Sequence, residues 1–482
     1  MADLRPVLLI IGALVTLLGL FMVAPLLVDL AHDNDSWRGF AISMVITLFI
    51  GILLLVGTRG GPVRLSTRGA FFLTTFSWLV LCLFAALPFL LNEAPLTLTN
   101  AIFESMSGLT TTGSTVMTGL DEADHGILLW RAILQWIGGI GIIVTALAVL
   151  PMLKVGGMQL FGAEWFEPMG KILPRAQSFA IGIGVAYVGL TALCAFVYWS
   201  LGIETFDAIC LAMTTLSTGG FANSDISFAA FSHGGADIAA SIFMVLAALP
   251  FAAYILAVRG DLGALFKNVQ IRGFLILLLI LIAIMTFYII SVAHVGAAHP
   301  IRLATFNVVS IITGTGFGFG DFQQWGPMAA PFFFILMFVG GCAGSTTCAI
   351  KIFRFQVAYE GLRSYVRRMI YPHEVDTMIY NGRILPDSAL YSVLGFIFVF
   401  FACYAVLAIG LSLTGLDMVT SISSAATAIS NVGPGLGSVV GPSGNFSSLP
   451  DPAKWMLVVG MIVGRLEIFT VLVLFTPRFW MS

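Results

Sequence analysis

The sequence contains 482 residues, of which 59% are hydrophobic and only 10% are charged, and its mean hydropathy is +1.01. Ordinary soluble domains carry about a quarter charged residues, so this composition excludes a soluble globular protein and predicts an all-α polytopic membrane protein. The net charge is −2 and the sequence shows no basic patch, so no nucleic acid is expected as a partner and the lipid bilayer is the expected surrounding.

Apolar stretches predict ten full spans, and no cleavable signal peptide is expected at the first. The spans cover residues 6–30, 38–58, 70–91, 127–150, 178–201, 236–258, 272–294, 329–350, 388–413 and 453–476. Of the 22 Lys and Arg residues, 17 lie in the termini and in the linkers 59–69, 151–177, 259–272 and 351–388. The positive-inside rule therefore predicts that both termini are cytoplasmic. Within the spans, charge is expected almost only at Arg465 and Glu467.

One unit recurs four times in the sequence. Each copy consists of a full span, a segment too short to cross a bilayer, a polar loop and a second full span. Two crossings separate successive loops, so all four loops are expected to enter from the outer face. Four parallel units predict a pseudo-symmetric arrangement of span, pore helix and span around one central pore. The short segments are FESMSGLTTTGS, CLAMTTLSTGGF, FNVVSIITGTGF and SSAATAISNVGP, with aligned glycines Gly113, Gly220, Gly316 and Gly433. The predicted parts are two extra N-terminal helices at 1–68 and four pore repeats at 69–176, 177–270, 271–387 and 388–482.

Threonine and glycine at the end of a half-span favour a cation filter. A potassium ion exchanges its water for carbonyl oxygens of extended backbone, and glycine supplies the positive φ that turns successive carbonyls inward. The C-terminal end of each half-helix adds partial negative charge. Asp121, Asp225 and Asp321 follow the glycines and are interpreted either as cation-concentrating groups at the outer mouth or as turn and cap residues. A single such segment would equally fit a helix C-cap followed by a loop.

These four segments, with WIGGIGIIV at 136–144, GGCAGST at 340–346 and GRLEIFTVLVLF at 464–475, resemble the TrkH branch of the Trk/Ktr/HKT potassium-uptake proteins over essentially the whole chain. The resemblance implies a homodimer in the bacterial inner membrane with one pore in each protomer, and a cytosolic TrkA-type nucleotide-binding ring that controls opening. It implies that potassium is transported and bound in the filter. It assigns the filter to Thr111, Thr112, Gly113, Ser114, Thr218, Gly219, Gly220, Phe221, Gly314, Thr315, Gly316, Phe317, Asn431, Val432, Gly433 and Pro434.

The small and polar run in the span 329–350 has two interpretations. The resemblance implies an intramembrane loop that obstructs the pore, whereas small residues at this spacing also suit close helix packing. The chain departs from the family at Thr347, Cys348 and Ala349, where the family usually has alanine and paired glycines, so we expect a stiffer second half of the loop. The expected gate residues are Gly340, Gly341, Cys342, Ala343, Gly344, Ser345, Thr346 and Thr347, together with Arg465.

Arg465 is expected to line the pore below the filter, because a cation inside a span needs a partner or water. The alternative is an ion pair with Glu467, but residues two positions apart on a helix do not face each other. The basic charge of the linker 351–388 is explained by topology or by docking of the regulatory ring.

An enzyme and an ion-coupled symporter are the two alternative functional classes. An enzyme is not expected, because the sequence has no metal-ligand cluster, nucleophile–base pair or phosphate-binding loop, and the six cysteines are interpreted as small buried hydrophobic residues. A potassium symporter coupled to protons or sodium stays open, although it would need a titratable or sodium-binding site in the membrane.

Overall fold

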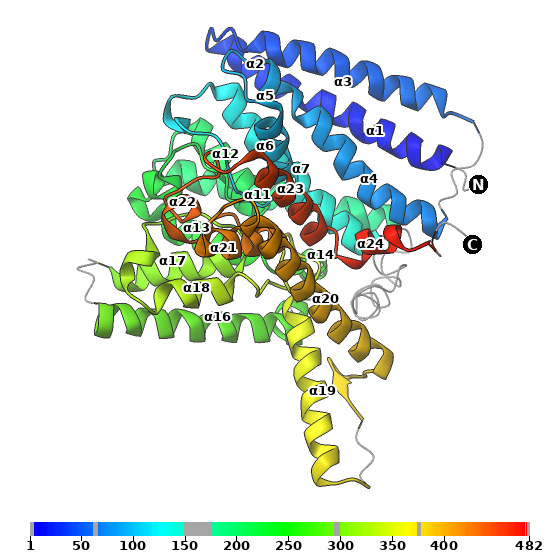
Figure 1. Ribbon diagram of the computed structural model, residues 1–482, viewed down its shortest axis with the longest axis vertical. Helices are drawn as coiled ribbons and strands as arrows, with labels where there is room; N and C mark the ends of the chain where they lie inside the picture. The colour runs from blue at the N-terminus through cyan, green and yellow to red at the C-terminus, as the bar shows by residue number, and fades with distance from the viewer. Residues whose placement is uncertain are drawn as a thin grey trace.

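The computed structural model describes residues 4–60, 66–148, 176–261, 263–293, 299–373, 377–477 and 479. Most of the predicted linker 151–177 lies outside these residues. The described chain is almost entirely helical, and its one β-hairpin joins β1 (Ile379–Tyr380) to β2 (Arg383–Ile384). Figure 1 shows a bundle of helices from which α19 and the adjoining end of α20 project.

Seven helical stretches in the described chain are long and apolar enough to cross a membrane, and two bent helix pairs raise the number to nine. The prediction of ten full spans is therefore wrong. The straight spans are Arg5–Ala31 (α1, Arg5–Phe21, and α2, Val23–Ala31), Trp37–Gly57 (α3), Arg68–Leu91 (α4, Thr67–Ala85, and α5, Leu87–Leu91), His125–Ile143 (within α7, His125–Ala148), Ala180–Ser200 (within α11, Ala176–Ser200), Val269–Val292 (α16, Val269–Tyr288, and the π-helical turn η5, Ile289–Ala293) and Asp387–Ser412 (α20).

Three predicted spans depart from straight helices. The span at 236–258 bends by 92° between α13 (Ala236–Ala247) and α14 (Phe251–Val258), and Pro250 lies at this bend, where it cannot donate a helical hydrogen bond. The last span bends by 106° after α23 (Asp451–Arg465). The span at 329–350 is helical only over α18 (Ala329–Leu336), and irregular chain replaces the rest. The last span continues after its bend as α24 (Phe469–Leu472) and η7 (Val473–Phe475).

The two additional N-terminal helices lie at the edge of the bundle, where α1 packs against both α3 and α4, and α3 also packs against α5 (Figure 1). Close approach of α1 and α3 depends on glycine. A Cβ atom added to Gly51 would lie 2.8 Å from the backbone nitrogen of Thr16, and one added to Gly12 would lie 2.9 Å from the Cβ of Leu54. Small residues at such positions let membrane helices come into backbone contact.

Four short helices occupy the middle of the bundle, where each packs against a long helix of its own unit. Contacts of α6 with α23, of α12 with α7 and of α17 with α13 join the first unit to the fourth, the second to the first and the third to the second. The Asp417 carboxylate caps α21 by accepting a 3.1 Å hydrogen bond from the Thr420 backbone nitrogen, and bonds with Thr420 hold the pKa of this carboxyl below its usual value. The four are α6 (Leu98–Leu109), α12 (Thr205–Leu216), α17 (Pro300–Ile312) and α21 (Met418–Ser430).

The remaining short elements lie between these helices or flank the long ones. The loops after the short helices contain η1 (Leu120–Glu122), η3 (Ser227–Phe231), η4 (His233–Gly235), η6 (Phe322–Trp325) and α22 (Gly437–Val440). At the other end of the bundle are α15 (Gly263–Phe266) and α19 (Ile352–Ile370), which packs against α20.

Candidate functional site

The structure brings the four aligned glycines into one closed ring, here called the four-glycine ring (Gly113, Gly220, Gly316 and Gly433). Each glycine lies against the backbone of the next segment in chain order, and the last lies against the first. A Cβ atom added to Gly113 would lie 2.2 Å from the Gly219 carbonyl oxygen. The corresponding distances are 1.9 Å from Gly220 to Thr315, 1.9 Å from Gly316 to Val432 and 3.0 Å from Gly433 to Thr112. Side chains at these positions would therefore collide with the neighbouring segment.

The backbone of all four segments has the same alternating conformation. The ring glycines have φ angles of 85°, 77°, 77° and 98° in chain order. The residues two positions earlier also have positive φ: Thr111 at 51°, Thr218 at 51°, Gly314 at 70° and Asn431 at 52°. Positive φ costs a non-glycine residue roughly 1–2 kcal/mol, and such strain gathers at functional sites. The alternation expected from the sequence is thus present in every segment.

Cavities lie on both sides of the ring and differ greatly in size. The outer cavity has a volume of about 280 Å³ and is lined by all four ring glycines, with Arg131 and Asp225 in its wall. The inner cavity has a volume of only about 30 Å³, room for roughly one or two waters. Its lining includes Ser345, Cys348 and Arg465. The ring therefore has a wide cavity on one side and a narrow one on the other.

Side chains join the first and fourth segments directly. The Asn431 amide nitrogen donates to the Thr112 hydroxyl oxygen at 2.9 Å and to the Met461 carbonyl oxygen at 3.0 Å. The Ser114 hydroxyl donates to the Gly433 carbonyl oxygen at 2.8 Å. These bonds close the ring at the point where the first and fourth segments meet.

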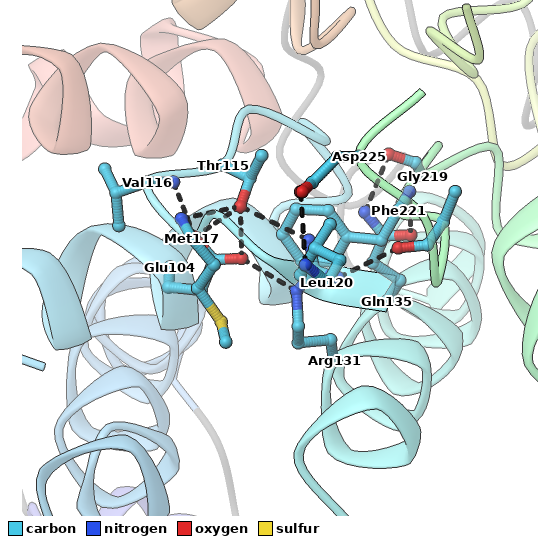
Figure 2. A network of polar contacts seen from close by, with 11 residues as sticks. Glu104, Thr115, Val116, Met117, Leu120, Arg131, Gln135, Gly219, Phe221 and Asp225 are labelled. Carbon is cyan, nitrogen blue, oxygen red and sulfur yellow. Dashed lines mark hydrogen bonds and ion pairs between the residues drawn. The ribbon is translucent and has the colours of Figure 1, made fainter. Parts of the chain in front are cut away.

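A buried ion pair, missed from the sequence, joins the first and second segments (Figure 2). Arg131 of α7 and Glu104 of α6 are 1% and 0% exposed, and Arg131 Nε lies 2.9 Å from Glu104 Oε1. The guanidinium also donates to the Ala222 carbonyl oxygen at 3.0 Å, and the carboxylate accepts from the Val116 backbone nitrogen at 2.9 Å. The expectation that charge in the spans is almost confined to Arg465 and Glu467 is therefore wrong. The sequence signal that could have indicated this ion pair is the presence of opposite charges, Glu104 and Arg131, within two predicted helices.

The three acidic residues expected at the outer mouth all bond to loop backbone. Asp225 accepts from the Gly119 and Leu120 backbone nitrogens at 2.9 and 3.2 Å, and Asp121 accepts from the Asp225 backbone nitrogen at 3.3 Å. Asp321 caps η6 by accepting from the Gln323 backbone nitrogen at 3.0 Å. These contacts fit the turn and cap interpretation. Asp225 alone of the three also lines the outer cavity.

The predicted intramembrane loop lies beneath the ring, in irregular chain that follows α18, and its residues are buried. The loop forms hydrogen bonds with the break between α13 and α14. The Cys342 backbone nitrogen donates to Ala248 O at 3.0 Å, and the Phe251 backbone nitrogen donates to Gly344 O at 3.0 Å. The loop therefore satisfies polar groups that the broken helix would leave bare. Cys348, predicted to be a small buried hydrophobic residue, lies 4.0 Å from the Thr111 hydroxyl. Ala349 has a φ of 56°, which is strained for alanine.

Arg465 ends α23 and points into the space below the ring. Its guanidinium donates to the Thr346 carbonyl oxygen at 3.2 Å and to the Gly138 carbonyl oxygen at 3.1 Å, and it contacts the Cys348 thiol. A cation at a helix C-terminus is favoured by the helix dipole. Glu467 has a φ of 59° and pairs with Arg354, so the alternative ion pair with Arg465 is not formed. The expectation that Arg465 lies inside a continuous span is wrong, because the helix stops there.

Comparison with known proteins gives one consistent result. The sequence profile of the family described as TrkH, cation transport protein, matches residues 38–481. The Trk system potassium uptake protein TrkI of Halomonas elongata is 46% identical over 98% of this chain and 96% of that protein. The Trk system potassium uptake protein TrkH of Escherichia coli K12 is 36% identical over 98% of both chains. The crystal structure of the potassium transporter TrkH from Vibrio parahaemolyticus superposes with a TM-score of 0.91 at 33% identity, covering 99% of this chain and 100% of that one.

Proposed function

The chain belongs to the TrkH family of cation transport proteins, and from this premise we propose that it carries potassium ions into the bacterial cell through a pore along the axis of the four-glycine ring. It is a multi-pass membrane protein whose relatives are named as potassium uptake proteins, a class of transporters and not of enzymes. From its family we propose that it lies in the bacterial inner membrane, and from the charge of its linkers that both termini are cytoplasmic.

The observation that carries the proposal is the closed ring itself. Four segments from four parts of the chain share one backbone conformation, and each ring glycine is in contact with the next segment. Main-chain carbonyls held in such an arrangement replace the water around a cation. The proposed potassium ligands lie within the sixteen filter residues of 111–114, 218–221, 314–317 and 431–434. The short helices α6, α12, α17 and α21 end next to these segments and add partial negative charge for an entering cation.

We assign the gate to residues 340–347 and Arg465. The irregular chain of the loop and the guanidinium of Arg465 lie below the ring. The cavity there has a volume of about 30 Å³, whereas the cavity above the ring has a volume of about 280 Å³. The loop is held by hydrogen bonds to the break in the α13–α14 pair and by Arg465, so its displacement requires a few localised bonds to be exchanged. A cytosolic regulatory ring of the TrkA type, acting on the projecting α19, is the proposed source of that displacement, and the working assembly is a homodimer with two pores.

The proposal is tested by reconstituting the purified protein in liposomes with opposing potassium and sodium gradients. A pore that selects potassium gives a reversal potential near the potassium equilibrium potential. Coupling to protons or sodium shifts the reversal potential when the gradient of the coupled ion is changed at constant potassium. A reversal potential that follows sodium as closely as potassium contradicts the proposed selectivity.

A further inference from the structure

Gln135 of α7 forms hydrogen bonds with the backbone on both sides of one ring glycine, Gly220. Its amide nitrogen donates to the Gly219 carbonyl oxygen at 2.7 Å, and its amide oxygen accepts from the Phe221 backbone nitrogen at 3.0 Å. The side chain is fully buried, and a Cβ atom added to Gly219 would lie 2.3 Å from it. Figure 2 shows Gln135 reaching from its helix to this segment. The two bonds enclose Gly220, so one side chain fixes the backbone on both sides of a ring residue.

The second segment needs outside support more than the other three. In the first and third segments the residue before the ring glycine is a threonine, and its hydroxyl bonds to a second threonine at 2.7 Å in Thr110–Thr112 and at 2.8 Å in Thr313–Thr315. The fourth segment has valine there and the two bonds of the Asn431 amide. The second segment has two successive glycines, which have no side chain to restrain their peptide planes.

We propose that Gln135 is a positioning residue for ion selectivity, which fixes the direction of the Gly219 carbonyl and thereby the ability of the second segment to discriminate potassium from sodium. This inference rests on the proposed function. An amide is suited to the task because it is both a donor and an acceptor, so it can hold a carbonyl and an N–H group at once. Without it, the Gly219–Gly220 and Gly220–Phe221 peptides can rotate and let the filter adjust to a smaller ion, because carbonyl position sets selectivity whether through size or field strength.

A second residue on the same face of α7, Arg131, also binds the second segment. Arg131 lies one turn earlier on α7, four residues away, and such residues share a face. Its guanidinium holds the Ala222 carbonyl oxygen at 3.0 Å and lies over the Phe221 ring at 4.2 Å. The segment from Gly219 to Ala222 is therefore attached to a single helix of the preceding unit. Gln135 holds the part that forms the ring, and Arg131 holds the part beyond it.

The test compares three variants of the full-length protein in liposomes. Gln135→Met keeps the length of the side chain and removes both hydrogen bonds. Gln135→Leu also removes both hydrogen bonds, with a shorter and branched apolar side chain. The matched control is Gln323→Met, because Gln323 binds the Gly437 backbone nitrogen and carbonyl oxygen in the same two-sided way, at 2.6 and 3.3 Å, in an outer loop. The potassium-to-sodium permeability ratio and the melting temperature are measured on each preparation.

We expect the permeability ratio to fall about tenfold in the Gln135→Met variant, a change that corresponds to about 1.4 kcal/mol. A lower ratio is also expected for Gln135→Leu, and an unchanged ratio for Gln323→Met. An unchanged ratio in either folded Gln135 variant would overturn the inference. Loss of folding in both would also overturn it, because Gln135 would then be a structural residue. If the wild-type protein itself fails to select potassium, the proposed function fails instead.

Discussion

Arg465 donates a 3.2 Å hydrogen bond from its Nη1 to the main-chain carbonyl oxygen of Thr346, and so joins the end of α23 to the loop beneath the ring. The same guanidinium bonds to Gly138 O of α7 at 3.1 Å, and Arg465 lines the narrow inner cavity. One side chain therefore joins the loop to two helices beside the proposed pore. This arrangement can both repel an arriving cation and hold the loop in place.

Replacing Arg465 by alanine should raise potassium flux several-fold. The variant removes the positive charge below the ring and the bonds that hold Thr346, so both obstacles weaken together. Rubidium uptake into liposomes measures the flux, and the melting temperature is taken on the same preparation. Arg363→Ala is a suitable control, because Arg363 is an exposed residue of α19 paired with Glu360 at 3.6 Å. A variant that conducts no faster and melts much lower would show that Arg465 serves stability instead.

Deleting Gly344 to Thr347 should also raise flux, at a cost in stability. The deletion removes obstructing chain from the narrow cavity, but it also leaves the Phe251 backbone nitrogen without its bond to Gly344 O. One unpaired buried group costs roughly 1–3 kcal/mol, so a lower melting temperature is expected together with faster rubidium uptake. Unchanged flux in a folded deletion variant would contradict the assignment of this segment to the gate.

Gly316→Ser should abolish selective uptake. The added Cβ would lie 1.9 Å from the Val432 carbonyl oxygen, so the third and fourth segments must move apart. Gly320→Ser is a matched control, because both glycines have a φ of 77° and a Cβ at Gly320 meets nothing within 4 Å. The control carries the backbone strain of roughly 1–2 kcal/mol without the collision. Growth of a potassium-uptake-deficient host on limiting potassium compares the two, and normal growth of Gly316→Ser would contradict the ring.

Glu104→Gln should destabilise the protein by about 3–5 kcal/mol, because it leaves Arg131 as an uncompensated buried charge. The unpaired cation would also lie in the wall of the outer cavity and slow cation entry. Thermal unfolding measures the first effect and rubidium uptake the second. The double variant Glu104→Gln, Arg131→Met removes the charge as well and should recover part of the stability. Equal melting temperatures for Glu104→Gln and the wild type would show that the pair is not required.

Local pattern predicted the alternating backbone conformation of the four segments, but tertiary partners could not be found in the same way. Glycine and threonine in TTTGS and its three counterparts indicate alternating φ, and that conformation is present at Gly113 and Thr111. The contact of Gln135 with Gly219, by contrast, joins residues 84 positions apart, and a lone glutamine in an apolar helix gives no indication of its partner. Pro250 is a local signal for the break within 236–258, although that stretch was predicted as a full span. The bend after Arg465 contains no proline, so the sequence gives no such signal there.

The reversal potential of wild-type protein and Gly316→Ser in liposomes, under opposing potassium and sodium gradients, tests the ring as a filter most directly. The wild type should reverse near the potassium equilibrium potential. Gly316→Ser should either conduct nothing or reverse close to the midpoint of the two equilibrium potentials. A wild-type reversal potential that depends equally on the two ions, or a Gly316→Ser variant with unchanged potassium selectivity, would contradict the assignment of the four-glycine ring as the site that selects the ion.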